Sequence, residues 1–174
     1  PYHKEYYNFI VNFIEKNKIK NIIDIGCASG FFFKSLPKEL NLNYAVSNVE
    51  GETDLYFYHD ASPINTLSSD VSKFQNAVIK NVKKIHTKSL NSILQNFKIN
   101  RHIDYMNIDV EGYEEKVLEG FDLNRYRPSV ISIEYLDLKM KKLEFKNNNI
   151  DNLIQSNLYK YLIDNDYFFV NWLH

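Results

Sequence analysis

The sequence predicts an α/β domain in which a mostly parallel central sheet is covered by helices on both faces. Segments with the period of an amphipathic helix alternate along the chain with short β-branched runs, which are typical of buried strands. The chain of 174 residues is also long enough to bury one hydrophobic core. Ligands of such sheets bind beyond the carboxyl ends of the strands, so functional residues are expected there.

The expected elements follow from periodicity and from turn residues. Strands are expected over residues 21–25, 43–48, 54–59, 82–88, 102–110, 128–136 and 167–173. Helices are expected over residues 2–16, between Gly30 and Pro37, and over 89–97, 113–118 and 152–164. Residues 51–53 are expected to form a turn and residues 61–70 a loop. Ser89 is placed to cap its helix, and Gly120 to end the next one.

Composition and charge narrow the function classes. Hydrophobic residues make up 44% of the chain and charged residues 25%, as in ordinary globular domains. The net charge of −1 argues against sequence-independent binding to nucleic acid, which needs a basic surface. Cys27 is the single cysteine, which excludes an intramolecular disulfide and favours a reducing compartment. The sequence shows neither an apolar run of membrane-spanning length nor a leader pattern, so a cytoplasmic protein is expected.

The stretch IIDIGCASGFF contains the first candidate binding residues. A strand that ends at Gly26 and a helix that starts after Gly30 leave a turn without bulky side chains, which lets a ligand approach the main chain. Free N–H groups at the helix start favour an anionic group, and Asp24 is placed to pair with an ammonium group or with a network of ordered water. The Gly-x-x-x-Gly spacing differs from the Gly-x-Gly-x-x-Gly of dinucleotide sites, so NAD fits less well. The alternative is a turn that needs glycine only for close packing.

Three further stretches follow this one within residues 21–135: NYAVSNVEGE, HIDYMNIDVEGYEEKVLEGF and RPSVISIEY. In this order the four stretches resemble the FkbM-type family of S-adenosylmethionine-dependent methyltransferases, with IDVEGYE as the most specific part. The resemblance implies the Rossmann-like class I methyltransferase fold. It also implies S-adenosylmethionine as cofactor, S-adenosylhomocysteine as product, and methylation of hydroxyl groups, commonly on sugars of glycans and lipo-oligosaccharides or on polyketides.

By this resemblance the cofactor-binding residues lie in the turn after the first strand and at later strand ends. The residues expected to contact the cofactor are Asp24, Gly26, Cys27, Ala28, Gly30, Phe31, Ser47, Asn48, Ser68 and Asp109. Among them, Asp24, Gly26 and Gly30 would hold the methionine and ribose side. Cys27 is interpreted as a small buried residue rather than a nucleophile, because no base lies near it in the sequence.

The sequence departs from the family pattern in two places. About one β-α unit is missing near residues 37–43, where family members carry a strand ending in an acidic residue for the ribose hydroxyls. The chain also stops before a final strand. Either the protein is pared down or the sequence omits segments, and the second explanation is favoured. We expect a single domain over residues 1–174, with an N-terminal helix within residues 1–18 and the core over residues 21–174.

Asp109 and Glu111 are candidate catalytic residues, because an aliphatic hydroxyl is a weak nucleophile until a base accepts its proton. They lie two positions apart at a strand end, which directs both side chains to one face, and Glu134 ends the next strand. Three carboxylates in one cleft repel each other unless one is protonated or a cation joins them. A general base is favoured over a divalent metal with oxygen ligands. Helix capping is the alternative for Glu111, whereas Asp109 in apolar surroundings would be costly without a function.

His59 is the third candidate catalytic residue, because it ends a strand beside a loop that a substrate could reach. His86 is expected to serve a helix entry and His102 to lie on the surface. Tyr113 is placed either to stack on the acceptor or to pack against the sheet.

Two function classes remain. The first is an O-methyltransferase that acts on a free hydroxyl of a sugar, a glycan or another small biosynthetic metabolite. The second is a non-catalytic or degenerate cofactor-fold module in a biosynthetic assembly, which the missing β-α unit would favour if it is genuinely absent. The sequence leaves the acceptor and the oligomeric state open.

Overall fold

The computed structural model describes residues 2–26, 44–59, 62, 64–74, 81–100, 102–136 and 150–170. Within them the helices are α1 (Tyr2–Asn17), α2 (Ser69–Phe74), α3 (Leu90–Asn96), α4 (Glu114–Glu119), α5 (Leu123–Tyr126), α6 (Ile150–Gln155) and α7 (Asn157–Asp164). The strands are β1 (Ile22–Ile25), β2 (Ala45–Ser47), β3 (Gly51–Phe57), β4 (Asn81–Ser89), β5 (Tyr105–Ile108) and β6 (Val130–Ile133). The helix expected between Gly30 and Pro37 lies outside the described residues. So does the region near residues 37–43, where a β-α unit of the family pattern is expected to be missing.

The central sheet has the order β1-β5-β6, and both of its strand pairs are parallel. This confirms the parallel pairing that the alternation of helices and strands predicts. Successive side chains of β5 point to opposite faces of the sheet. Met106 and Ile108 are fully buried toward one helical layer, whereas Tyr105 is buried toward another.

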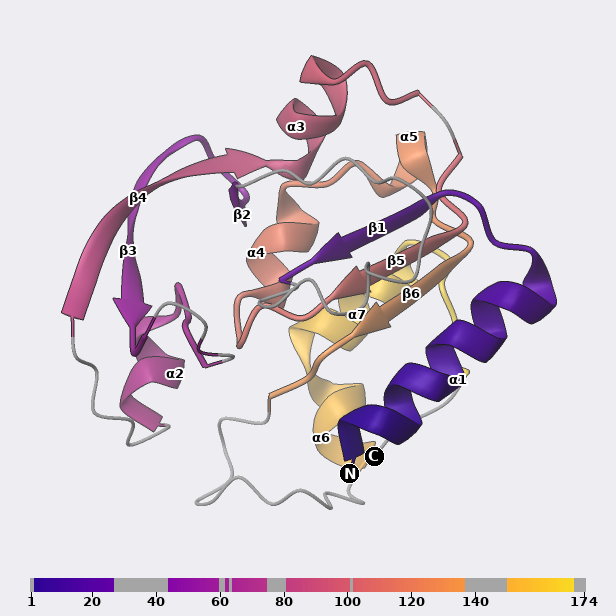
Figure 1. Cartoon of the computed structure of the whole chain (residues 1–174), viewed down its shortest axis with the longest axis horizontal. Helices are drawn as coiled ribbons and strands as arrows, with labels where there is room; N and C mark the ends of the chain where they lie inside the picture. The colour runs from indigo at the N-terminus through magenta and orange to yellow at the C-terminus, as the bar shows by residue number, and fades with distance from the viewer. Residues whose placement is uncertain are drawn as a thin grey trace.

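Helices cover both faces of this sheet, as expected (Figure 1). On one face, α3, α4, α5 and α7 contribute Leu94, Val117, Leu123 and Leu158, among others, to the larger core. On the opposite face, α1 places its apolar stripe against the sheet. The parallel sheet is therefore the middle layer of three, and its strand ends are held from both sides.

A second sheet has the order β2-β4-β3, with β2 parallel and β3 antiparallel to β4. Figure 1 shows β3 and β4 as a long ribbon at one side of the central sheet. The turn expected at residues 51–53 is wrong, because these residues are the first of β3 and pair with Ile85, His86 and Thr87. The chain bends one step earlier, over residues 48–50.

The C-terminal region also differs from expectation. The helix expected over residues 152–164 is two helices, because the side chain of Ser156 accepts a hydrogen bond from the N–H of Tyr159 and so starts α7. Residues 167–170 form no strand. The rest of the strand expected over residues 167–173 lies outside the described part of the chain.

Shorter elements complete the comparison with expectation. Ser89 caps α3 as predicted, accepting from the N–H of Ser92 at 3.1 Å. Gly120 ends α4, but with φ −86°, so it serves close approach rather than a left-handed cap. A Cβ at this position would overlap the carbonyl oxygen of Ser47. The glycine therefore lets the end of β2 lie against the end of α4. The sequence predicted neither α2 nor α5, each of which is six residues or shorter.

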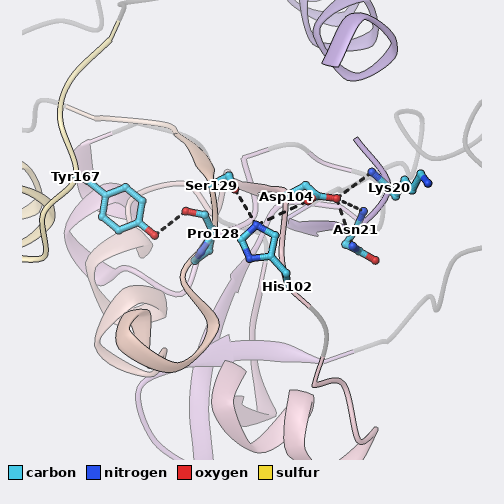
Figure 2. A network of polar contacts seen from close by, with 7 residues as sticks. All are labelled: Lys20, Asn21, His102, Asp104, Pro128, Ser129 and Tyr167. Carbon is cyan, nitrogen blue, oxygen red and sulfur yellow. Dashed lines mark hydrogen bonds and ion pairs between the residues drawn. The ribbon is translucent and has the colours of Figure 1, made fainter. Parts of the chain in front are cut away.

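Asp104 holds the amino-terminal edge of the central sheet together (Figure 2). Its Oδ2 accepts hydrogen bonds from the main-chain N–H groups of Lys20 and Asn21, at 3.0 and 2.9 Å. These bonds lower the pKa of Asp104 from its usual value. On the far side of the same edge, the hydroxyl of Tyr167 donates to the carbonyl of Pro128 at 2.8 Å.

Within the described ranges, no helix combines the length and the apolar character that crossing a bilayer requires.

Candidate functional site

Three carboxylates meet beyond the carboxyl ends of the central sheet. Asp109 directly follows β5, Glu134 directly follows β6, and Glu111 lies in the turn after Asp109. One carboxylate oxygen from each lies within 4.8 Å of the others. The parallel register produces this meeting, since Asp109 N–H donates to Ile25 and Glu134 N–H donates to Ile108, both at 2.9 Å. The grouping predicted from strand ends is therefore present.

One member of this carboxylate cluster holds a proton at neutral pH. Burial, together with the negative charges of Asp109, Glu111 and Glu114, raises the pKa of Glu134 to about 9. A hydrogen bond with Asp109 acts in the same direction, so protonated Glu134 is the donor in it. The Oε2 atom of Glu134 is buried and has no hydrogen-bond partner among the described residues. The cluster thus places a neutral carboxyl group beside carboxylates, the arrangement that like charges at short range require.

The turn over residues 110–112 has an unusual backbone. Glu111 adopts φ 55° and Gly112 φ 86°, both in the left-handed region that side chains other than glycine rarely enter. A Cβ at Gly112 would overlap the side chain of Val71 in α2. The carboxylate of Glu114 accepts hydrogen bonds from the N–H groups of Val110 and Gly112, each at 3.1 Å. The turn is thus hydrogen-bonded to the first residue of α4, Glu114, and lies against Val71 of α2.

Helix capping is therefore wrong as the role of Glu111. The N-cap of α4 is Tyr113, and Glu114 receives the free N–H groups of the turn. Burial raises the pKa of Glu114, although its hydrogen bonds from the main chain oppose that effect. The side chain of Glu111 belongs to the carboxylate cluster instead.

The end of β1 adjoins the cluster. The Oδ1 atom of Asp24 accepts a hydrogen bond from Asn107 on β5 at 2.8 Å. Burial is the main cause that raises the pKa of Asp24 to about 6; the bond from Asn107 opposes it, and the charge of Asp109 adds to it. Gly26 has φ 99°, and a Cβ there would overlap the carbonyl oxygen of Asp109. The close approach of two strand ends therefore requires the glycine, which supports the close-packing interpretation of this position. A cofactor contact of Gly26 stays a prediction.

The structure distributes the other expected site residues unevenly. Cys27, Ala28, Gly30 and Phe31 lie outside the described residues. Their part in cofactor binding stays a prediction.

Ser47 and Asn48 contact the far end of α4 rather than the cluster. Ser47 is buried, and its hydroxyl donates to the Asn48 side-chain oxygen at 3.2 Å. The Asn48 amide donates to Glu119 at 2.7 Å. A cofactor role for these two residues stays a prediction.

A cleft of about 320 Å³ opens beside Glu134 of the cluster, a volume at the low end of those typical of small-molecule sites. Glu134, Ser68, Tyr113 and Tyr135 are among the residues that line it. Ser68 and Tyr113 are thus brought to the site. His59 is not among the lining residues; it is exposed, and its carbonyl accepts from neighbours in its own loop.

Two features of the site differ from the sequence interpretation or were missed by it. Asp109 is exposed just beyond β5, so the cost of burial that was to distinguish it from a structural residue is absent. Asn107 was missed as the partner of Asp24. No signal in the sequence pairs these two residues, because the register Asp24↔Asn107 arises from strand pairing across 83 positions.

A Ser-His-Asp grouping at the opposite edge of the sheet has the wrong geometry for a catalytic triad. His102 Nε2 lies 2.8 Å from Ser129 Oγ and 3.8 Å from Asp104 Oδ1 (Figure 2). A triad needs the serine and the aspartate on opposite ring nitrogens, whereas here both face the same one. The grouping is a surface contact at the strand starts, in agreement with the expectation for His102.

Comparison with known families gives one match. The family model of the methyltransferase FkbM domain matches residues 3–161, a range that includes β1, the cluster and the cleft. A comparison with curated proteins and one with solved structures gave no match. The match confirms the resemblance that the sequence stretches carry.

Proposed function

The chain belongs to the FkbM methyltransferase family, and from this premise we propose that it transfers a methyl group from S-adenosylmethionine to a hydroxyl of a sugar or another small biosynthetic metabolite. The observation that carries the proposal is the meeting of Asp109, Glu111 and Glu134 at the carboxyl end of a parallel sheet, directly beside the end of β1. We further propose the Rossmann-like class I architecture for the whole domain. The parallel order β1-β5-β6 with helices on both faces supports it.

The residues at the end of β1 fit the proposed cofactor. Asp24 offers a carboxylate for the ammonium group of the methionine part, and its pKa of about 6 leaves it largely ionised at neutral pH. Gly26 leaves no side chain between the end of β1 and Asp109. When bound, S-adenosylmethionine supplies a methyl group activated by the positive charge on its sulfur.

The cluster supplies the base that a hydroxyl acceptor needs. Asp109 is exposed to solvent and hydrogen-bonded by a protonated Glu134. We assign it the role of accepting the hydroxyl proton while the acceptor oxygen gains the methyl group. Glu111 stabilises the proton on Glu134 through its own negative charge. A general base of this kind contributes about 10²- to 10⁴-fold to the rate.

The cleft beside the cluster supports an uncharged, hydroxylated acceptor. Its lining combines the rings of Tyr113 and Tyr135 with the acidic groups of Asp70 and Glu115. The lysine of the lining, Lys116, is engaged by Glu119 at 2.8 and 2.9 Å. A phosphorylated or carboxylated acceptor would meet mainly negative charge there.

A divalent cation is the second candidate for the work of the cluster. The 4.8 Å grouping of three carboxylate oxygens favours it, because such oxygens are the ligands that Mg²⁺ and Mn²⁺ prefer. The cation would then orient and polarise the acceptor hydroxyl in place of a protein base. Chelation distinguishes the two, since only the cation mechanism loses activity in EDTA and regains it with added Mg²⁺ or Mn²⁺.

Asp109→Asn tests the proposal. S-adenosylhomocysteine release from S-adenosylmethionine would be measured with a panel of methyl glycosides as probe acceptors. We expect kcat to fall by roughly 10²- to 10³-fold in Asp109→Asn. Asp54→Asn is the matched control, because Asp54 pairs with Lys84 on the outer ribbon and lies outside the cluster. Cofactor binding without turnover on any acceptor would favour the non-catalytic module.

A further inference from the structure

Thr66 connects the second sheet (β2-β4-β3), here called the outer sheet, to the turn that carries Glu111. Its main chain pairs with Tyr56 of β3 through two hydrogen bonds, at 2.9 and 3.2 Å. Its side chain is 2% exposed, and the hydroxyl donates to the main-chain carbonyl of Glu111 at 2.7 Å. The same hydroxyl accepts from the N–H of Ser68 at 2.9 Å, so it uses its one donor and one of its two acceptor sites.

The bond from Thr66 reaches the one residue of the turn whose backbone is costly. Glu111 is not glycine, yet it adopts φ 55°. A non-glycine residue in such a conformation persists only where its surroundings enforce it, at a typical cost of about 1–3 kcal/mol. A turn that relaxed to negative φ would redirect the Glu111 side chain, which the left-handed conformation places within 4.8 Å of Asp109 and Glu134.

We propose that Thr66 is a positioning residue: by fixing the carbonyl of Glu111, its buried hydroxyl holds the 110–112 turn in the left-handed conformation that brings the Glu111 carboxylate into the cluster. The catalytic consequence rests on the proposed function, whereas the conformational one does not. Val71 adds to the effect by packing against Gly112. Residues far apart in the sequence thereby define one strained turn, and the loop that supplies Ser68 to the cleft is fixed by the same hydroxyl.

The test compares Thr66→Val, which keeps the shape of the side chain and removes the hydroxyl, with Thr66→Ser, which keeps the hydroxyl. Thr87→Val is the matched control. Thr87 is also buried, at 4% exposed, and its hydroxyl also donates to main-chain carbonyls, those of Val49 and Gly51. Both valine variants should lose similar thermal stability, so a general loss of stability is accounted for.

The first readout needs no activity. Backbone chemical shifts and the HN–Hα coupling of Glu111, measured by NMR on the folded full chain, report its φ directly. We expect Thr66→Val to lose the left-handed signature, and Thr66→Ser and Thr87→Val to keep it. A left-handed Glu111 that survives in Thr66→Val would overturn the proposal.

The second readout is turnover of S-adenosylmethionine with the methyl glycoside probes. We expect about a tenfold fall in kcat in Thr66→Val, an unchanged KM for the cofactor, and rescue in Thr66→Ser. A changed turn with unchanged kcat would overturn the positioning role. If the parent turns over no probe acceptor, the proposed function fails, while the NMR result still decides whether Thr66 sets the turn.

Discussion

At Glu134, burial and the charges of Asp109, Glu111 and Glu114 all raise the pKa, so the carboxyl group keeps its proton at a much higher pH than an ordinary glutamate does. Asp24 shows a milder form of the same effect, because the amide of Asn107 donates to it and favours its charged form. The two residues flank Asp109, one on the side of β1 and the other on the side of β6. Environment alone thus gives chemically similar carboxyl groups different pKa values.

The raised pKa of Glu134 makes the stability of the fold depend on pH. A carboxyl group whose pKa is higher in the folded state stabilises that state fully below its unfolded pKa, near 4.5, and loses this contribution as the pH rises through about 9. Glu134→Gln removes the titration. We therefore expect the free energy of unfolding of the variant, relative to the parent, to rise by roughly 3–4 kcal/mol from pH 5 to pH 8.

Urea unfolding in EDTA-containing buffer at both pH values checks this expectation. Glu115→Gln serves as the control, since Glu115 is an exposed neighbour outside the carboxylate cluster. A pH-independent difference between Glu134→Gln and the parent would show that Glu134 is ionised in the folded state.

At the scale of the element, β5 links the two ends of the sheet. Its carboxyl end leads into Asp109 and the strained turn, whereas Asp104, just before its start, binds the chain that leads into β1. Two hydrogen bonds from main-chain N–H groups fix the entry of β1 beside β5. The register Asp24↔Asn107 follows from that entry, and with it the geometry of the site at the other end.

Asp104→Ala should therefore weaken the pairing of β1 with β5. The pKa of Asp104 is lowered in the folded state, so its contribution is present above its unfolded pKa and is lost as the pH falls through the lower folded value. We expect a loss of about 1 kcal/mol at pH 7, since Asp104 is partly solvent-screened, and a smaller loss below pH 4. Thermal unfolding at both pH values measures these losses.

The exposed Asp70, paired with Lys73 at 3.5 Å, offers a control whose alanine variant should change stability by less than about half as much. A loss for Asp104→Ala that is no larger than for Asp70→Ala would contradict this role.

The sequence predicted elements best where one signal dominated. The N-terminal helix, the strand before Gly26 and the Ser89 cap all appear as expected. The prediction of a turn at residues 51–53 was wrong. Glycine and acidic residues indicated a turn locally, but pairing with the long β4 makes these residues part of β3. The prediction of one helix over residues 152–164 failed for a different reason. A serine within an apolar helical pattern does not show from the sequence alone that it caps a second helix, as Ser156 does.

At the scale of the whole molecule, the family and the parallel sheet could be predicted, and so could the cluster of strand-end carboxylates. The contacts that give the cluster its properties could not. The bond from Thr66 to Glu111 spans 45 positions, and that from Asn107 to Asp24 spans 83, so no local pattern reports them. Two sheets therefore contribute to one site, the inner one through its strand ends and the outer one through the loop that holds the turn.

The end of β1 and the adjoining cluster form the proposed site for S-adenosylmethionine. Calorimetric titration with S-adenosylhomocysteine, with NAD as the comparison ligand, tests it most directly. We expect one-to-one binding with a dissociation constant in the micromolar range, equivalent to about −8 kcal/mol, no comparable binding of NAD, and loss of binding in Asp24→Ala. Absence of S-adenosylhomocysteine binding to the parent chain, or unchanged binding in a folded Asp24→Ala variant, would contradict the account.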